Sequence, residues 1–533
     1  MTTNQVLLTL AAVAISPLCS EAVAKKSQPQ NVLFILVDDL GWNDLSFMGS
    51  DYYESPNLDR LAASGVVFTD AYASCPVSSP SRASIMSGQY TTRHGVTDWI
   101  GEAEGENWRK QNRHSKLLPA TYVWAIDHDL TLMPELLKEN GYTTFIAGKW
   151  HLGEEETDWP EYHGFDINKG GYKSGSPKGG YFAPYDNPRL EDGPDGENLS
   201  MRLANETVSF IENHVKTKKK EPFFAYLSFY AVHGSIQTTE ETWRYFRDKA
   251  ERMGIAEQGF EVDRTLPVRL HQDNPVYAGL IKQMDDAVGR VIDALDKMGL
   301  DENTLIVFTS DNGGVVSGDS FSSSLAPLRG GKGRQFEGGI RVPLIVKSPK
   351  ATAMNGEKCS VPVYGIDYYP TIMEYAGVKV PESVSLDGVD INPLLNGESI
   401  ADRSLFWHYP HYGNQGGEPS SIIRKGDWKL IYYHEDLRCE LYNLAIDLSE
   451  NEHLNIQYPD KVKELKAELL AWLDETNARM PVADPIYDPV AESKVKYNWA
   501  TKTLQQKENE RKKMLSPEYK PNATWWGSNV TVD

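Results

Sequence analysis

A serine-rich segment, residues 74–88, contains the side chain best suited to nucleophilic chemistry, Ser78. Ser79 followed by Pro80 predicts a helix start, because serine can cap free amides and proline tolerates the first helical position. Ser78 would then stand just ahead of a helix N-terminus, where unpaired N–H groups and the helix dipole favour an anion. Arg82 adds a fixed fork of donors. The segment therefore indicates either a nucleophile facing sulfate or phosphate, or an ordinary capped turn.

Two carboxylates follow the first strongly apolar run of the chain. Residues 31–37, NVLFILV, predict a strand buried on both faces, and Asp38 and Asp39 come directly after it. Open α/β sheets build their sites just beyond the carboxyl ends of such strands. The alternative is that the two aspartates cap a turn.

Basic and imidazole side chains follow another predicted strand, residues 142–147. Lys149 and His151 lie in the segment 148–153, GKWHLG. Residues two apart on an extended segment point the same way, which suits a shared anion site. They could equally form a surface pair.

Two further predicted strands also end in polar residues. Residues 222–230 lead to His233, and residues 304–310 lead to Asp311 and Asn312. A lone histidine is more often structural than catalytic, but its place after a buried strand favours a site. With four strand ends of this kind, we expect the side chains to meet along one edge of a sheet.

A glycine-rich basic segment, residues 328–343, supplies one more candidate, Lys332. Glycines allow a backbone to approach a ligand closely. A flexible surface loop is the alternative interpretation.

The alternation of strands and helices predicts an α/β fold, a large doubly wound mixed sheet flanked by helices. From about residue 404 short strands and a helix at 461–477 predict a smaller C-terminal antiparallel sheet subdomain with a covering helix. We therefore expect a catalytic domain over 28–400, this subdomain over 401–480 and an irregular extension over 481–533.

The overall charge limits the possible partners. The 533 residues carry a formal net charge of −21, which argues against a nucleic-acid binder or a basic membrane-surface protein. An anionic substrate must therefore be attracted by a local positive pocket. No later stretch is long and apolar enough to span a bilayer.

The N-terminus predicts export. Residues 6–18 are a short apolar run and Ala22-Val23-Ala24 offers a small-x-small cleavage site, so 1–24 is typical of a secretory signal peptide and predicts a secreted or periplasmic protein. A lipoprotein anchor at Cys19 is disfavoured by the bulky Leu18 before it. After cleavage three cysteines remain, enough for one bridge but not for a disulfide framework.

The segment Ser78-Ser79-Pro80-Ser81-Arg82, through to Gly88, resembles the signature of the type I sulfatases of the alkaline-phosphatase superfamily. In that signature a Cys or Ser, any residue, Pro, Ser and Arg precede a short helix ending at Gly. Counted from Cys75, the proline falls one place too early and no arginine stands four residues on, so Ser78 sets the register. Other motifs match the same family in order over roughly residues 30–480: VDDLG at 37–41, GKWH at 148–151, His233, SDNG at 310–313, and Lys332 with EGG at 337–339.

The resemblance implies a chemistry for each motif. A dedicated maturase acting on serine would oxidise Ser78 to formylglycine, whose hydrate attacks the sulfur and later expels sulfate. The metal ligands would be Asp38, Asp39, Ser78, Asp311 and Asn312, a set of hard oxygen donors that suits Ca²⁺ and, with stricter geometry, Mg²⁺.

The remaining motif residues would handle charge and protons. Arg82 and Lys149 would hold the modified residue and the sulfate charge. His151 would take the proton from the second hydroxyl. His233 and Lys332 would bind sulfate and donate a proton to the leaving oxygen, and either of them could be the acid.

We expect three further segments, residues 92–100, 168–186 and 408–415, to form the rim of the site. Their aromatic, imidazole and amide side chains suit sugar recognition, which makes a sulfated carbohydrate the expected substrate. Packing between subdomains is an equally good explanation for any one of them. The alternatives to a sulfatase are a phosphatase or phosphodiesterase using unmodified Ser78 with two zinc ions, and a non-catalytic carbohydrate-binding relative. The candidate substrate-binding residues are His94, Asp98, Trp99, Lys173, His408 and His411.

Overall fold

The computed structural model describes residues 30–218 and 220–520. The predicted signal peptide, residues 1–24, lies outside the described residues. Within the described part no helix combines the length and apolar character needed to cross a membrane. Cys75, Cys359 and Cys439 are all free thiols.

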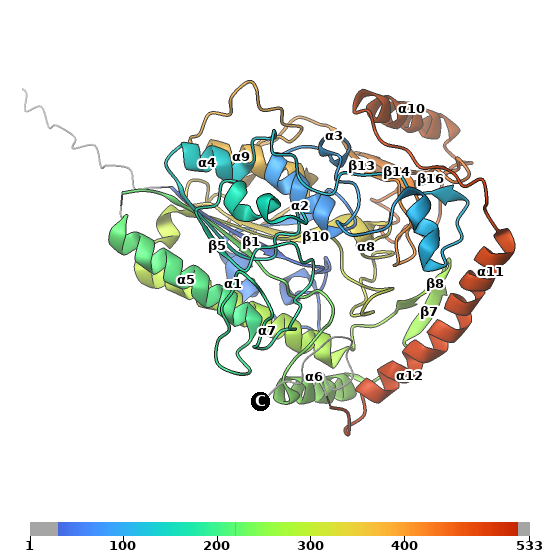
Figure 1. Ribbon diagram of the computed structural model, residues 1–533, viewed down its shortest axis with the longest axis horizontal. Helices are drawn as coiled ribbons and strands as arrows, with labels where there is room; N and C mark the ends of the chain where they lie inside the picture. The colour runs from blue at the N-terminus through green and yellow to red at the C-terminus, as the bar shows by residue number, and fades with distance from the viewer. Residues whose placement is uncertain (1–29, 219, 521–533) are drawn as a thin grey trace, which may run out of the picture.

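A nine-stranded mixed sheet forms the centre of the molecule (Figure 1). Its central strands run parallel, whereas β10 is antiparallel to both of its neighbours. Every residue of β1 and β9 is buried, as their continuous apolar sequences predict. In spatial order the strands are β11 (Lys358–Cys359), β2 (Val66–Tyr72), β10 (Arg341–Lys347), β9 (Thr304–Ser310), β1 (Asn31–Val37), β6 (Phe223–Ser228), β4 (Thr143–Gly148) and β5 (Ile167–Lys169), with β12 (Val363–Tyr364) also paired to β2.

Helices cover both faces of this sheet, which confirms the doubly wound architecture. Successive side chains of β1 alternate between two cores: Leu33 and Ile35 belong to one, and Phe34 and Leu36 to the other. Figure 1 shows the two helical layers on opposite sides of the sheet. The first contains α1 (Pro56–Ser64), α5 (Leu199–Thr217), α6 (Glu240–Met253) and α7 (Pro275–Met298), and the second α2 (Ser78–Ser87), α4 (Met133–Glu139) and α9 (Tyr368–Ala376).

The smaller C-terminal sheet is also present, and all of its strand pairs are antiparallel. One face packs Ile423 and Leu430 against α10 (Pro459–Glu475), and the other packs Trp407 against the large domain. Lys429 reaches into that contact, 3.0 Å from Glu337 and 2.7 Å from Glu450, and all three are buried. The four strands are β13 (Ser404–Tyr409), β14 (Ser420–Lys425), β15 (Trp428–Tyr433) and β16 (Cys439–Asn443).

Several short elements lie outside these sheets and helical layers. Two strand pairs lie outside the sheets above, and two helices of one turn precede or follow site segments. They are β3 (Leu117–Leu118) with β17 (Val482–Ala483), β7 (Phe260–Asp263) with β8 (Leu266–Arg269), α3 (Thr91–His94) and α8 (Glu337–Ile340).

The expectation of an irregular extension over 481–533 is wrong for much of its described part. It contains α11 (Pro489–Asn498), the π-helix η8 (Trp499–Thr503) and α12 (Leu504–Met514), which run in line along one side of the molecule (Figure 1). These helices present hardly any apolar face, so the periodicity that reveals a helix is missing from their sequence. Polar contacts hold α12 instead, including Arg511 Nε to Asp273 Oδ2 at 2.7 Å.

Candidate active site

The four predicted strand ends meet at the carboxyl edge of the large sheet. In the sheet β9, β1, β6 and β4 are consecutive neighbours, and all four run parallel. Asp38 and Asp39 follow β1, and Asp311 follows β9. Lys149 follows β4, and His233 lies five residues beyond β6. Parallel strands with this order deliver side chains from distant parts of the sequence to one place.

Three buried carboxylates form the base of this site. Asp38, Asp39 and Asp311 each offer an oxygen, and these oxygens all lie within 4.8 Å of one another. Asn312 Nδ2 donates to Asp39 Oδ1 at 2.8 Å, which leaves its amide oxygen 3.2 Å from Ser78 Oγ. Asp39 adopts a left-handed φ of 61°, which is uncommon outside glycine although aspartate tolerates it better than most residues.

Each carboxylate contacts at least one cationic side chain, and Asp38 contacts two, Lys149 and Arg82. Lys149 Nζ lies 2.7 Å from Asp38 Oδ2, and Lys332 Nζ lies 2.8 Å from Asp39 Oδ2. Arg82 Nε donates to Asp311 Oδ2 at 2.8 Å. Complete burial raises the pKa of Asp38 to about 8, although Lys149 opposes the shift. Burial also acts on Asp311, but Arg82 and Lys149 outweigh it and hold the pKa of Asp311 well below its usual range.

The donor set fits a hard divalent cation. Its ligand atoms are carboxylate and amide oxygens, the kind that Ca²⁺ and Mg²⁺ bind, and they carry no histidine or cysteine among them. Buried carboxylates this close repel one another, so a cation among them removes an electrostatic cost. The residues therefore suit the predicted metal site in type and in spacing.

Ser78 lies directly beside this cluster. Its Oγ is 3.0 Å from Asp38 Oδ1 and 3.2 Å from Lys149 Nζ. Helix α2 begins at Ser78 itself, and its N-cap Val77 makes no side-chain capping bond, so the expected cap at Ser79 is wrong. The Ser79 hydroxyl instead accepts from Ile100 N at 3.1 Å and lies 3.3 Å from His151 Nδ1, because tertiary partners compete successfully for it.

The two histidines approach the site from different directions. His151 Nε2 donates to Ile100 O at 3.1 Å, which makes Nδ1 the acceptor of the ring. Burial and nearby Lys149 hold the pKa of His151 well below its usual value. His233 Nε2 lies 3.7 Å from Asp39 Oδ2, and burial together with Lys332 lowers the pKa of His233 to about 4.

A cavity of about 1000 Å³ opens above Ser78. Of the residues predicted to bind substrate, Trp99 and Lys173 line it. The other four, His94, Asp98, His408 and His411, are buried and absent from its wall.

Those four side chains make internal contacts instead. His94 Nε2 lies 3.0 Å from Ser84 Oγ, His408 Nδ1 lies 2.7 Å from Ser421 Oγ, and His411 Nε2 lies 2.9 Å from Thr97 Oγ1. Asp98 accepts from Tyr409 Oη at 3.0 Å. All four are buried in the interior, His94 against α2, His408 on the face of the small sheet that α10 covers, and Asp98 and His411 against one another.

The cavity wall also contains residues that the sequence did not indicate. They come from the C-terminal segment and from the loop at 319–320, neither of which carries a recognisable motif. The sequence feature that could have pointed to the C-terminal part of the wall was the basic run Arg511-Lys512-Lys513. The additional lining residues include Asp319, Lys507, Glu510, Lys513 and Tyr519, and Lys178 joins them from the predicted rim segment 168–186.

The fold and this site define a hydrolase of the alkaline-phosphatase superfamily, and sequence comparison identifies its branch. The sequence model of the family described as Sulfatase matches residues 30–378. A second, described as N-sulphoglucosamine sulphohydrolase, C-terminal, matches residues 332–479. The chain belongs to the sulfatase family and is a sulfuric ester hydrolase.

Individual relatives agree with this assignment over most of the chain. A sulfatase of Formosa agariphila is 33% identical, with 87% of this chain and 92% of that protein covered. Human N-acetylgalactosamine-6-sulfatase is 30% identical over 72% of this chain and 68% of its own length. The crystal structure of Ps i-CgsB in complex with k-i-k-neocarrahexaose superposes with a TM-score of 0.68 at 28% identity, and covers 90% of this chain and 100% of that one.

Proposed function

We propose that this sulfatase removes sulfate esters from a carbohydrate, using formylglycine made from Ser78 and a bound Ca²⁺. The observation that carries the proposal is the placement of Ser78 Oγ at the base of the cavity, between the carboxylate cluster and Lys149. A hydroxyl in an ordinary capped turn would not share a buried site with three carboxylates.

Asp38, Asp39, Asp311 and Asn312 would hold the cation, with the side chain at position 78 completing the set. When bound, the cation would polarise a sulfate oxygen and the attacking hydroxyl. Ca²⁺ is favoured over Mg²⁺ because its flexible coordination accepts a crowded set of carboxylates.

Oxidation of Ser78 to formylglycine would supply a renewable nucleophile in place of a serine that becomes trapped as a sulfate ester. Asp38 and Lys149 contact the atom that this oxidation changes, so they are in place to hold either form. The modification requires a maturase that acts on serine, which we propose as a partner during biogenesis.

The other site residues would stabilise charge and move protons. Lys149 and Lys332 are both buried cations at the cavity base, where low dielectric strengthens their pull on a sulfate group. His151 Nε2 donates to Ile100 O, so Nδ1 is the unprotonated nitrogen and lies beside the Ser79 hydroxyl. This nitrogen is therefore suited to act as a base. His233 and Lys332 both lie against Asp39 Oδ2 and both line the cavity, so either can reach the leaving oxygen as acid.

A carbohydrate substrate is supported by the relatives and by the cavity. One relative is named for N-acetylgalactosamine 6-sulfate chemistry, and another was solved with a carrageenan hexaose. The cavity wall combines the half-buried Trp99 with lysine, serine and amide groups, which suits a polar ring with hydroxyls. With residues 1–24 as an export signal, we propose that the enzyme acts outside the cytoplasm, secreted or periplasmic.

The test compares protein made with and without a serine-acting maturase. Peptide mass analysis should find formylglycine at position 78 only in the first preparation, and only that preparation should release sulfate catalytically from a sulfated sugar. Fully active enzyme with unmodified Ser78 would disprove the mechanism. Hydrolysis of the matching phosphate ester at the same rate would show that the site does not select sulfate.

A further inference from the structure

The C-terminal helix α12 forms part of the active-site wall. Lys507, Glu510 and Lys513 of this helix line the same cavity as Ser78 and Lys149. The wall continues through Met514 to Tyr519. A segment more than 400 residues from Ser78 in sequence therefore faces the substrate cavity.

Buried polar contacts fix this helix in place. Arg511 is buried and donates through Nε to Asp273 Oδ2 at 2.7 Å and through Nη2 to Ala256 O at 3.0 Å. Glu508 accepts from the backbone of Phe260 at 2.8 Å, and Trp243 Nε1 donates to Met514 O at 3.2 Å. Separating the buried Arg511 from Asp273 would deprive the guanidinium of its closest carboxylate partner in low dielectric. The helix therefore holds its position before substrate arrives.

The charges on the outer part of the cavity are unbalanced. Three acidic side chains line it, and each is already paired: Glu154 with Lys173 at 3.7 Å, Asp319 with Lys332 at 3.7 Å, and Glu510 with Lys507 at 2.7 Å.

Two lysines remain available on the same wall. Across residues 30–218 and 220–520, neither Lys178 nor Lys513 takes part in an ion pair. Two unpaired cations at the cavity of a chain with net charge −21 provide the local positive field that an anionic ligand requires.

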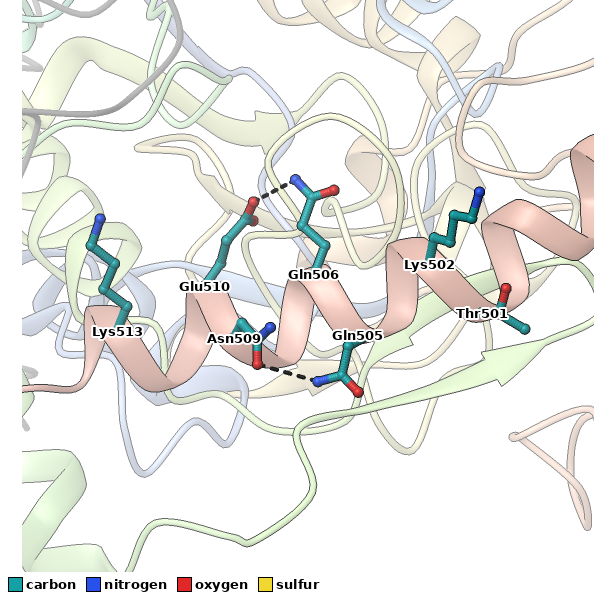
Figure 2. Close-up of a pocket in the computed structure, with 7 residues that line it drawn as sticks. All are labelled: Thr501, Lys502, Gln505, Gln506, Asn509, Glu510 and Lys513. Atoms are coloured by element: carbon teal, nitrogen blue, oxygen red, sulfur yellow. Dashed lines mark hydrogen bonds between the residues drawn. The ribbon is translucent and has the colours of Figure 1, made fainter.

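The cavity also continues into an outer groove. Figure 2 shows the residues that line this groove along η8 and α12, with Gln506 pointing toward Glu510 and Gln505 pointing toward Asn509 on the other side of the helix. Glu510 and Lys513 line both the groove and the active-site cavity, so the two hollows share a border. At about 1000 Å³ the cavity alone is at the upper end for a single small ligand.

We propose that Lys513 and Lys178 bind a second anionic group, a sulfate or a carboxylate, on a sugar next to the one that loses its sulfate. The preferred substrate is then a polyanionic oligosaccharide whose chain leaves the cavity along α12. The inference rests on the proposed carbohydrate sulfatase function and names the substrate class for that same site. Lysine ammonium groups pair readily with such anions, and the amides of the groove suit sugar hydroxyls.

The experiment measures a preference. The kcat/KM of the mature enzyme is compared for a disaccharide with sulfates on both sugars and for the same disaccharide with only the reacting sulfate. We expect Lys513→Glu to lower the ratio of the two values about tenfold and Lys178→Ala to lower it severalfold. Lys512→Glu, the same charge change on an exposed neighbour outside the cavity wall, should leave the ratio as it is in the wild type.

Equal ratios in all variants would overturn the inference, as would an equal fall in Lys512→Glu, because a general field effect would then suffice. Lys513→Gln replaces Lys513→Glu if the latter fails to fold. Calorimetric titration of the Ser78→Ala protein with the disulfated disaccharide keeps the test independent of turnover. Binding that is about tenfold weaker or lost on adding Lys513→Glu supports the subsite even if no ester is hydrolysed. Unchanged affinity in the double variant, or no binding by the Ser78→Ala protein itself, overturns it.

Discussion

The cavity has two regions that are built in different ways. At its base, most of the charged side chains come from the ends of β1, β4 and β9, are almost completely buried, and form a network of ion pairs in which Asp38, for example, contacts both Lys149 and Arg82. On its outer wall, the lysines come from a loop and from a C-terminal helix, and two of them have no ion-pair partner in the described residues. The charged side chains of the base pair with one another inside the protein, whereas two lysines of the wall remain available to pair with a ligand.

This difference assigns hydrolysis of the ester to the base of the cavity and selection of the substrate to its outer wall. A buried, mutually satisfied charge network is costly to alter, since the loss of one partner leaves another charge unpaired in low dielectric. Partly exposed lysines cost little to change and alter only which ligand is attracted. We therefore expect substitutions at the base to affect turnover strongly, and substitutions at the wall to affect substrate preference more modestly.

The largest effect should come from the base, at Ser78. Ser78→Ala removes the hydroxyl that formylglycine is made from, so kcat should fall by about 10⁴-fold or more. Cys75→Ala should retain most of the activity, because Cys75 is buried outside the cavity wall and burial raises the pKa of its thiol well above the usual value. Sulfate release from a sulfated sugar measures both variants.

The reverse pattern, with an active Ser78→Ala and an inactive Cys75→Ala, would show that the nucleophile is the cysteine. Circular dichroism melts of both variants control for misfolding.

Removal of the metal should have the next largest effect on activity. Dialysis against a chelator should lower activity by at least about 100-fold, since the carboxylates of Asp38, Asp39 and Asp311 would lose the cation that offsets their repulsion. Ca²⁺ should restore activity at lower concentration than Mg²⁺. Ligand binding also stabilises the folded state, so thermal melts should rise with added Ca²⁺. Full activity and an unchanged melt in the metal-free protein would disprove the site.

The general acid can be assigned by changing the leaving group. His233→Ala and Lys332→Ala should each lower kcat/KM for a sugar sulfate, and the acid should do so by about 10²-fold or more. With 4-nitrophenyl sulfate, whose leaving group needs no proton, the loss from the acid variant should shrink to less than about tenfold. The residue that only binds sulfate should show the same loss on both substrates. Equal losses for both variants on both substrates would show that neither donates the proton.

Much of the base could be predicted from sequence because Asp38, Asp39 and Asp311 directly follow buried strands and Lys149 lies at the end of another. The run before Asp38 and that before Asp311 are both continuous and β-rich, and parallel pairing then brings their ends together. The part of the cavity wall formed by α12 could not be predicted in this way. Its helix is held by single polar contacts such as Arg511 with Asp273, which leave no periodicity in the sequence.

Burial explains why only two of the six predicted substrate-binding residues line the cavity. Trp99 and Lys173 line the cavity, but His408 and His411 are buried in the interior of the protein. Residue type alone cannot distinguish these cases, since a histidine that binds sugar and one that satisfies buried hydroxyls look alike in a sequence. The pairing of β13 with β14 decides it by placing His408 opposite Ser421.

The smallest kinetic effects should distinguish residues of the cavity wall from residues buried in the packing. Trp99→Ala should raise KM for a sulfated sugar by about three- to tenfold, because an indole beside the cavity offers apolar area to a sugar face. His408→Gln should leave KM unchanged and lower stability instead, since His408 contacts Ser421 Oγ and Arg479 O deep in the fold.

The pH dependence of stability tests the same distinction. Burial lowers the pKa of His408 to about 4 from 6.5, so the unfolded chain binds a proton there more readily. Its contribution to stability is then present above pH 6.5 and lost as pH falls toward 4. Thermal melts of His408→Gln should accordingly show a smaller fall in stability between these pH values than the wild type, and Trp99→Ala should show the wild-type slope. A rise in KM without any change in melting for His408→Gln would place that residue in the substrate site.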